Sequence, residues 1–404
     1  MKPQICDKLS AVMSNNPVVI IGGGFAGVYT TKELLKLGVP VLLISETNHF
    51  TFTPLLHEVA TGSLISHDVI FEYESFFPQD GFEFVRGWCD GIDRANKTIS
   101  VGSRTIAYSQ LVIATGATTN PWKIEGVEHA LVLKNVEDAV KLKRAMLSSI
   151  QDGDHHTCVS VIGGGPTGLE LIFDIAQMLG DLKKKNHEID YTIRMIHSRD
   201  TFCQTEQESV QTYIRQALDK AGIEVVCGAY AQAITETQVV TSVGTFDSNV
   251  TVLSAGVRPN TDMFKGDLEL DERGHVLVNE HLQTLQDPSI FAVGDVASFD
   301  GTPIPKLAQI AVREAPVAAQ NIAIIHRGTG EPMQVYTPKT LGILFSLGFG
   351  DGVGVIQSRI FKGVLAWYLW RTVYLFKTPG LGNKLRVAFS WTLGLFQGRN
   401  LTEL

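Results

Sequence analysis

Short runs of apolar residues, separated by glycine and polar positions, recur along most of the chain. Residues 18–21, 41–44 and 159–162 are continuous runs of this kind, and similar strands stand within 110–121, 190–196, 250–260 and 287–299. Such runs are typical of strands buried on both faces of a parallel sheet, because half-exposed strands alternate apolar and polar positions. The pattern therefore predicts an α/β fold built on parallel sheets.

Residues 16–46 form a complete strand–turn–helix–strand pattern. Gly22, Gly24 and Gly27 supply a G-x-G-x-x-G motif at its turn. The first glycine permits the tight turn, the second lets a pyrophosphate approach the backbone, and the third lets the helix sit close to the strand. Glu46 follows the second strand, 19 residues after Gly27, where an acid can bind a ribose.

Residues 157–179 repeat this design, with Gly163, Gly165 and Gly168 as the second motif. Two Rossmann-like folds in one chain suggest two dinucleotides, a tightly held flavin and an exchangeable nicotinamide. Asp295 supports a flavin, because it lies just past the strand within 287–299 and a carboxylate there suits a sugar or ribityl hydroxyl.

The second ribose position lacks the expected acid. Glu188 falls 20 residues after Gly168, but it precedes the strand 190–196 and so lies at the wrong end of it. His197 or Ser198 is therefore expected to reach the ribose.

The charge is distributed unevenly. The net charge is −8, yet the segment from Val355 onward has seven basic residues and one acid, a net +6, which leaves the first 354 residues at −14. Residues 355–378 and 383–396 mix aromatic and basic residues, as helices at a membrane surface do. Residues 355–398 are thus predicted to dock on a lipid bilayer surface. The alternative is a pair of amphipathic helices that pack on the body or in a homodimer interface.

Several motifs carry a family resemblance over about residues 17–398. The two glycine motifs, ATG, AGVRPN and FAVGD resemble the two-dinucleotide flavoprotein reductases. NHFTFTPLLHEVATG (48–62), PKLAQIAVREAPVAAQNI (305–322) and LFSLGFGDGVG (344–354) are similar to the type II NADH dehydrogenases, the single-subunit NADH:quinone oxidoreductases. The resemblance implies an FAD enzyme of the respiratory chain that passes a hydride from NADH, or NADPH, to FAD and electrons to a membrane quinone without pumping protons. It implies a peripheral position on the cytoplasmic face of the cell membrane.

The resemblance also implies a division of the chain and a set of site residues. The FAD-binding domain would comprise 17–125 and 263–335, the NAD(P)H-binding domain 126–262, and the membrane and quinone region 336–404. Glu170, Gln309 and Lys377 are the candidate catalytic residues, although Arg313 replaces the second glutamine of the A-Q-x-A-x-Q quinone motif. The cofactor-binding candidates are Gly22, Gly24, Phe25, Ala26, Gly27, Glu46, Cys89, Thr115, Gly116 and Asp295 for FAD, and Gly163, Gly165, Gly168, His197 and Arg199 for the nicotinamide nucleotide.

The cysteines bear on the electron acceptor. The five cysteines include no C-x-x-C or C-x4-C pair, and none follows Cys227, which disfavours a disulfide reductase and a sulfide:quinone reductase. Two alternatives stay open: a soluble flavin reductase of a protein acceptor, and a nucleotide-sensing flavoprotein. We expect no metal site and no nucleic-acid partner.

The family usually has Glu where His197 stands, and a Glu there repels a 2′-phosphate. His197 removes that repulsion, and Arg199 is able to pair with the phosphate, so NADPH is expected to be accepted. The alternative is that Ser198 or the backbone holds the ribose and NADH remains the donor.

Overall fold

The computed structural model describes residues 17–151, 156–202, 207–299, 304–397 and 399–401. They belong to two compact units. Unit 1 takes its residues from Met1–Phe50, Phe71–Thr118 and Arg258–Thr340, and unit 2 from Thr51–Ile70, Thr119–Val257 and Leu341–Leu404. The chain passes between the units near β3 (His49–Thr51), β4 (Ile70–Glu72), β10 (Ala117–Thr119) and β18 (Val257–Pro259).

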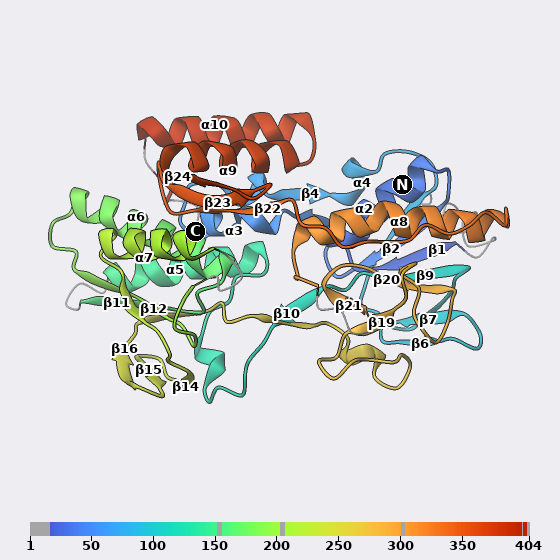
Figure 1. Ribbon diagram of the computed structural model, residues 1–404, viewed down its shortest axis with the longest axis horizontal. Coiled ribbons are helices and arrows are strands. Elements are labelled where there is room, and N and C mark those ends of the chain that lie inside the picture. The colour runs from blue at the N-terminus through green and yellow to red at the C-terminus, as the bar shows by residue number, and fades with distance from the viewer. Residues whose placement is uncertain (1–16, 152–155, 203–206, 300–303, 398, 402–404) are drawn as a thin grey trace, which may run out of the picture. The chain divides into compact units, whose positions relative to one another are not determined.

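The core of unit 1 is a five-stranded parallel sheet of order β20-β9-β1-β2-β5. Its strands are β1 (Val18–Ile21), β2 (Val41–Ser45), β5 (Phe82–Arg86), β9 (Gln110–Ile113) and β20 (Ile290–Ala292). The apolar runs predicted to be strands are confirmed, and β1, β9 and β20 are buried along their whole length. Helices α2 (Phe25–Lys36) and α8 (Ala308–Arg327) pack side by side (Figure 1).

Smaller elements complete unit 1. An antiparallel sheet consists of β6 (Gly91–Asp93), β7 (Thr98–Val101) and β8 (Arg104–Ala107). A parallel pair consists of β19 (Val276–Val278) and β21 (Ala297–Phe299). Short helices are α4 (Tyr73–Phe76), η4 (Asp262–Phe264) and η5 (Gly294–Val296).

Unit 2 contains the second parallel sheet, of order β13-β12-β11-β17. The strands are β11 (Thr157–Ile162), β12 (Tyr191–Ile196), β13 (Glu224–Val226) and β17 (Val250–Leu253). The helices are α3 (Leu56–Ala60), α5 (Val136–Gln151), α6 (Pro166–Lys185) and α7 (Glu208–Lys220), with short helices η1 (Thr53–Leu55), η2 (Ser66–Asp68) and η3 (Val127–His129). An antiparallel sheet consists of β14 (Ala231–Ile234), β15 (Gln238–Thr241) and β16 (Gly244–Asp247).

The C-terminal part of unit 2 differs from the prediction. The sequence suggested helices over 355–378 and 383–396, but an antiparallel sheet of β22 (Gly342–Ser346), β23 (Gly352–Ile356) and β24 (Arg359–Lys362) extends into the first segment. Gln357 and Ser358, at φ 47° and 66°, form the tight turn that joins β23 to β24. The helices are α9 (Gly363–Lys377) and α10 (Leu381–Gln397), and Figure 1 shows them side by side over this sheet. None of the described helices has the length and apolarity that a membrane crossing requires.

Candidate functional site

The carboxyl edge of the unit 1 sheet gathers most of the candidate flavin ligands. Gly22 follows β1, Glu46 follows β2, Thr115 follows β9, and Asp295 follows β20, and these four strands are consecutive neighbours in the sheet. The Thr115 hydroxyl donates a hydrogen bond of 2.7 Å to the carbonyl oxygen of Asn260, which fixes the loop after β9. This edge is where open α/β sheets bind their ligands.

The glycine turn before α2 fits a pyrophosphate. A Cβ on Gly22, whose φ is +107°, would stand 2.3 Å from the Ala114 carbonyl oxygen, so only glycine allows this close approach. A Cβ on Gly24 would meet no atom within 4 Å, which leaves space for a bound group at the N-terminus of α2. No side chain caps that N-terminus, so its N–H groups are directed at this space. Phe25 and Ala26 open the helix.

Tyr73 and Cys89 are two further buried residues of unit 1. No sequence motif indicated Tyr73, a buried residue whose hydroxyl donates to the Gly23 carbonyl oxygen at 2.8 Å and lies 3.4 Å from the Ser45 hydroxyl. Tyr73 therefore ties the glycine turn to the end of β2. Cys89 lies in the hydrophobic core, where burial raises the pKa of its thiol to about 11. Its contact with a flavin stays a prediction.

The glycine turn of unit 2 repeats this geometry. Gly163 has φ +113°, and a Cβ there would lie 2.3 Å from the Ser254 carbonyl oxygen. A Cβ on Gly165 would meet nothing within 4 Å, and Gly168 lies in the first turn of α6, which opens with Pro166. The second dinucleotide position predicted from the sequence thus has the same space and the same exposed helix N-terminus.

His197 follows β12 directly, and Glu188 precedes that strand, as predicted. The His197 Nδ1 accepts a hydrogen bond from the Gly164 N–H at 3.1 Å, and its Nε2 lies 3.2 Å from the Thr201 carbonyl oxygen, to which it donates. Burial lowers the pKa of His197, so the ring is neutral. Nδ1 thus holds the glycine turn and Nε2 holds the loop after β12, so a ribose contact by this ring would replace one of these bonds.

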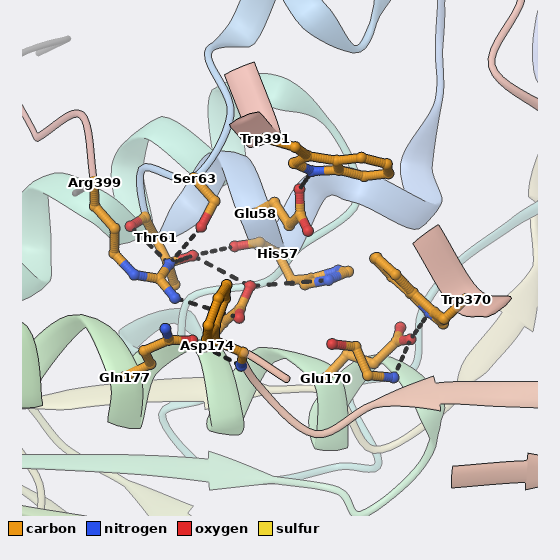
Figure 2. Close-up of polar contacts among 12 residues, drawn as sticks. His57, Glu58, Thr61, Ser63, Glu170, Asp174, Gln177, Trp370, Trp391 and Arg399 are labelled. Carbon is orange, nitrogen blue, oxygen red and sulfur yellow. Dashed lines mark hydrogen bonds and ion pairs between the residues drawn. The ribbon is translucent and has the colours of Figure 1, made fainter. Parts of the chain in front are cut away.

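Glu170, on α6, is buried, and its Oε1 accepts hydrogen bonds from the Trp370 indole N–H at 2.7 Å and the Ser346 N–H at 3.3 Å (Figure 2). Burial raises the pKa of this carboxyl to about 8. Glu170 is therefore protonated at neutral pH.

The face of α9 that carries Trp370 continues toward Lys377. Tyr374 lies one turn beyond Trp370, with ring centroids 4.7 Å apart, and Lys377 lies almost one turn further, as the last residue of the helix. Burial, with the added effect of Glu170, raises the pKa of Tyr374. Unit 2 thus brings two of the candidate catalytic residues, Glu170 and Lys377, to one side of α9.

A second buried carboxyl, Glu58 on α3, was not predicted as a functional residue. Its Oε2 accepts the indole N–H of Trp391 from α10, so each C-terminal helix donates one indole hydrogen bond to one buried acid (Figure 2). Burial raises the pKa of Glu58 to about 7. The adjacent His57 is also buried, with its Nε2 3.9 Å from the Asp174 carboxylate.

Asp174 on α6 binds a residue from the far end of the chain. Arg399 lies 3.5 Å from the Asp174 carboxylate, with only 9% of its side chain exposed. Its guanidinium also donates to the Thr61 hydroxyl at 2.8 Å, the Thr61 carbonyl oxygen at 3.2 Å and the Ser63 hydroxyl at 2.7 Å. No sequence motif indicated this contact, because 225 residues separate the two partners.

These groups form one buried cluster in unit 2. The cations are Arg399 and Arg371, whose guanidinium lies 4.1 Å from the ring centroid of Trp367 and 4.8 Å from that of Trp391. The carboxyls are Glu58, Glu170 and Asp174, three acids for two arginines. Electroneutrality in a buried space leaves one carboxyl protonated. The cluster can therefore hold a proton at neutral pH.

The third catalytic candidate, Gln309, belongs to unit 1, as the second residue of α8. Arg313 lies one turn later, with its guanidinium 3.4 Å from the Lys339 carbonyl oxygen. The roles of Gln309, Glu170 and Lys377 stay predictions. Within the described ranges, no three His, Cys, Asp or Glu side chains are grouped to hold a metal ion.

Comparison with known proteins decides the family. The family model of the pyridine nucleotide-disulphide oxidoreductases matches residues 16–315, about three quarters of the chain. The chain belongs to this family. The predicted α/β fold with two dinucleotide-binding parts is thereby confirmed.

Relatives in this family share most of the chain length at low identity. The chain is 25% identical to an internal alternative NAD(P)H-ubiquinone oxidoreductase of mitochondria from Arabidopsis thaliana, over 100% of this chain and 89% of that protein. It is 26% identical to a type II NADH:quinone oxidoreductase from Mycobacterium tuberculosis, over 95% and 88%. The fold is similar to that of NDH2 from Plasmodium falciparum, solved with NADH, with a TM-score of 0.88 at 18% identity over 96% and 100% of the chains.

Proposed function

We propose that this member of the pyridine nucleotide-disulphide oxidoreductase family is a type II NADH:quinone oxidoreductase. It is a flavoenzyme at the membrane surface that oxidises NADH, reduces a membrane quinone and pumps no protons. The resemblance of its motifs and the names of its relatives from plants and bacteria support this activity.

The observation that carries the proposal is the two-sided C-terminal helix pair. On the inner side, Trp370 and Trp391 bind the buried acids Glu170 and Glu58. On the outer side, large apolar residues are more than half exposed: Val364, Leu365, Tyr368, Phe376, Leu381, Leu385 and Phe389. A quinone is dissolved in the bilayer, so helices that join a lipid-facing surface to a buried proton-holding group suit a membrane quinone better than a soluble acceptor.

The residues of unit 1 have binding roles in this proposal. Bound FAD supplies the chemistry of accepting a hydride and releasing electrons. The N–H groups at the start of α2 bind the pyrophosphate, and Glu46 and Asp295 bind sugar hydroxyls. Gln309, in the resemblance, contributes to the quinone site.

The residues of unit 2 position the donor and supply a proton. The turn at Gly163–Gly168, which His197 holds in place, binds the pyrophosphate of NADH. Quinol formation takes up two electrons and two protons. The hydride from NADH accounts for both electrons and one proton, so one further proton is needed, and Glu170 holds a proton at its buried carboxyl. Lys377, on the same side of α9, is the second candidate donor.

The proposal includes location and assembly. The exposed face of α9 and α10 docks on the cytoplasmic side of the cell membrane, as a peripheral rather than a spanning contact. A homodimer through the same face is the competing arrangement.

The test is steady-state NADH oxidation by the purified FAD-loaded protein with a soluble quinone analogue and, separately, with ferricyanide. Rapid turnover with the quinone supports the proposal. Flavin that is reduced by NADH but reoxidised only by a protein acceptor, or not at all, contradicts it.

Donor choice is tested at Arg199, which follows β12 by three positions and is exposed. If Arg199 binds a 2′-phosphate, Arg199→Ala lowers kcat/KM for NADPH about tenfold, or ~1.4 kcal/mol, and leaves NADH within about twofold. Arg215→Ala, at an exposed arginine of α7, is the control. An NADH preference above about tenfold that Arg199→Ala leaves unchanged rules out the phosphate role.

A further inference from the structure

A buried carboxyl in unit 1, Glu314, has no role in the function proposed above. It lies in the second turn of α8, and its side chain is 2% exposed. Its Oε2 accepts the backbone N–H of Gly294 at 2.5 Å. Gly294 opens the short helix η5, whose next residue is the candidate flavin ligand Asp295.

The turn at Gly294 has little room to move. Gly294 has φ +81°, and a Cβ there would lie 2.9 Å from the Cβ of Ala26 and 3.5 Å from that of Ala311. The turn is therefore wedged between the first turn of α2, at the candidate pyrophosphate site, and the first turn of α8. The hydrogen bond to Glu314 fixes the remaining freedom of the turn, and with it the direction of Asp295.

Few charges act on Glu314. Lys306, before α8, lowers the pKa of Glu314, and Asp295, from η5, raises it. Burial is the largest cause and raises this pKa to about 8. Tyr336, from the segment after α8, also faces Glu314, and Ala26 of α2 lies against the Gly294 turn. Lys306 itself donates to the Ala297 carbonyl oxygen at 2.6 Å, just after η5.

We propose that Glu314 is a positioning residue of the flavin site, whose neutral carboxyl holds the Gly294–Val296 turn, and thereby Asp295, in the conformation that binds the cofactor. This inference rests on the proposed use of FAD. An ionised Glu314 would place a second negative charge beside Asp295 and close to the pyrophosphate site. FAD therefore binds preferentially to the protein in which Glu314 is protonated.

The sign of the pH dependence follows from linkage. The negatively charged cofactor favours the protonated carboxyl, so the pKa of Glu314 is higher in the complex than in the FAD-free protein. FAD affinity is then constant at low pH and falls as the pH rises through the pKa of the FAD-free protein, about 8. From pH 7 to pH 9 the dissociation constant should rise about tenfold.

The test is to dilute the FAD-loaded protein to equilibrium between pH 6.5 and pH 9.5 and measure released FAD by its fluorescence. Glu314→Gln keeps an acceptor for the Gly294 N–H but cannot ionise, so its affinity should be close to wild type at pH 7 and flat with pH. Glu314→Ala should bind FAD at least several-fold more weakly at every pH. Lys306→Met should move the fall to higher pH, because the lysine lowers the pKa of Glu314.

Glu83→Gln is the matched control, because Glu83, on β5, is another acid of unit 1 whose pKa is raised by burial, and this variant should keep the wild-type fall. Affinity that does not change with pH in the wild type, or that falls equally in Glu314→Gln, overturns the role of Glu314 and leaves the proposed function intact. If the protein binds no FAD at any pH, both the role of Glu314 and the proposed function are overturned.

Discussion

Two tryptophans of the C-terminal helices bind buried acids, and this pairing explains why the amphipathic segments carry aromatic residues on both sides. An indole N–H is a donor without acceptor capacity, so it suits a buried carboxyl oxygen. Trp370 and Trp391 also lie beside each other, with ring centroids 6.2 Å apart. The acids they bind, Glu170 and Glu58, are held at raised pKa values by burial.

The variant Glu170→Gln should be more stable than wild type at pH 8 and nearly equal to it at pH 5. The folded pKa of Glu170, about 8, lies above its unfolded value, so stability falls as pH rises from about 4.5 to 8. The amide keeps an oxygen for Trp370 and cannot ionise, so we expect a gain on the order of 4 kcal/mol at pH 8. Urea unfolding at both pH values measures it.

The same variant tests the proton role. An amide donates no proton to a quinone, so quinone reduction should fall about a hundredfold while flavin reduction by NADH is unchanged. Glu128→Gln, at an exposed acid of unit 2, should alter neither property. Unchanged quinone turnover in Glu170→Gln would leave Glu170 with a structural role only.

Replacing Arg399 should be costly, although it lies close to the end of the chain. Arg399→Met removes three hydrogen bonds and leaves the Asp174 carboxylate without its cation, at a cost of about 3 kcal/mol. Adding Asp174→Asn should recover part of this loss, because the uncompensated charge is gone. Urea unfolding gives the values, and Arg359→Met, at an exposed arginine of β24, should change stability by less than about 0.5 kcal/mol. A loss in Arg399→Met no larger than in the control excludes a stabilising ion pair.

At the scale of elements, the sequence predicted the two glycine units well. Their strands are continuous apolar runs, and the glycines have fixed steric tasks, so local signals suffice. The C-terminal segment was less predictable, because the apolar and basic residues of 355–362 are compatible with either a strand or a helix. The segment forms strands because of the turn at Gln357 and Ser358 and the pairing of β23 with β22. The contacts of Arg399 and Glu314 depend on tertiary packing, which no local pattern reports.

Helix α6 contains two glycines with opposite expected responses. Gly180 lies in the helix interior, where an added Cβ would be 3.6 Å from the Tyr191 hydroxyl, an ordinary contact. Gly180→Ala should therefore stabilise the protein by roughly 0.5–1 kcal/mol. At Gly168 a Cβ would lie 2.0 Å from the Gly163 carbonyl oxygen, so Gly168→Ala should destabilise the fold and weaken NADH binding. Thermal unfolding and NADH titration measure both, and equal effects at the two sites would contradict the assigned packing.

At the scale of the whole molecule, the charge asymmetry has two origins. The segment from Val355 onward has seven basic residues, but Arg371 and Arg399 belong to the buried cluster of unit 2. Lys377 lies on the side of α9 that carries Trp370, which leaves Arg359, Lys362, Lys384 and Arg386 for a lipid surface. Deletion of the C-terminal helices is a poor test of docking. Deleting the helices would uncover Glu58 and Glu170, so loss of activity on deletion would not separate docking from folding.

Docking should depend on both the apolar face and the remaining basic residues. Leu385 and Phe389 lie one turn apart on α10 and are 63% and 62% exposed, so Leu385→Glu with Phe389→Glu removes apolar contact without touching Trp391. Sedimentation with vesicles containing anionic lipid should fall at least tenfold for this variant. Raising the salt concentration should weaken wild-type binding without abolishing it, because salt screens the basic residues and leaves apolar burial intact.

Tyr230→Glu is the matched control, since Tyr230 is 63% exposed on unit 2 outside the C-terminal helices. It should bind vesicles as the wild type does. Quinone turnover of the double variant should stay normal with a soluble analogue and drop with quinone embedded in vesicles, because the buried acids and the flavin site are unchanged. If vesicle binding persists and the double variant instead turns from dimer to monomer in analytical ultracentrifugation, the face of α9 and α10 joins two copies of the chain rather than the membrane.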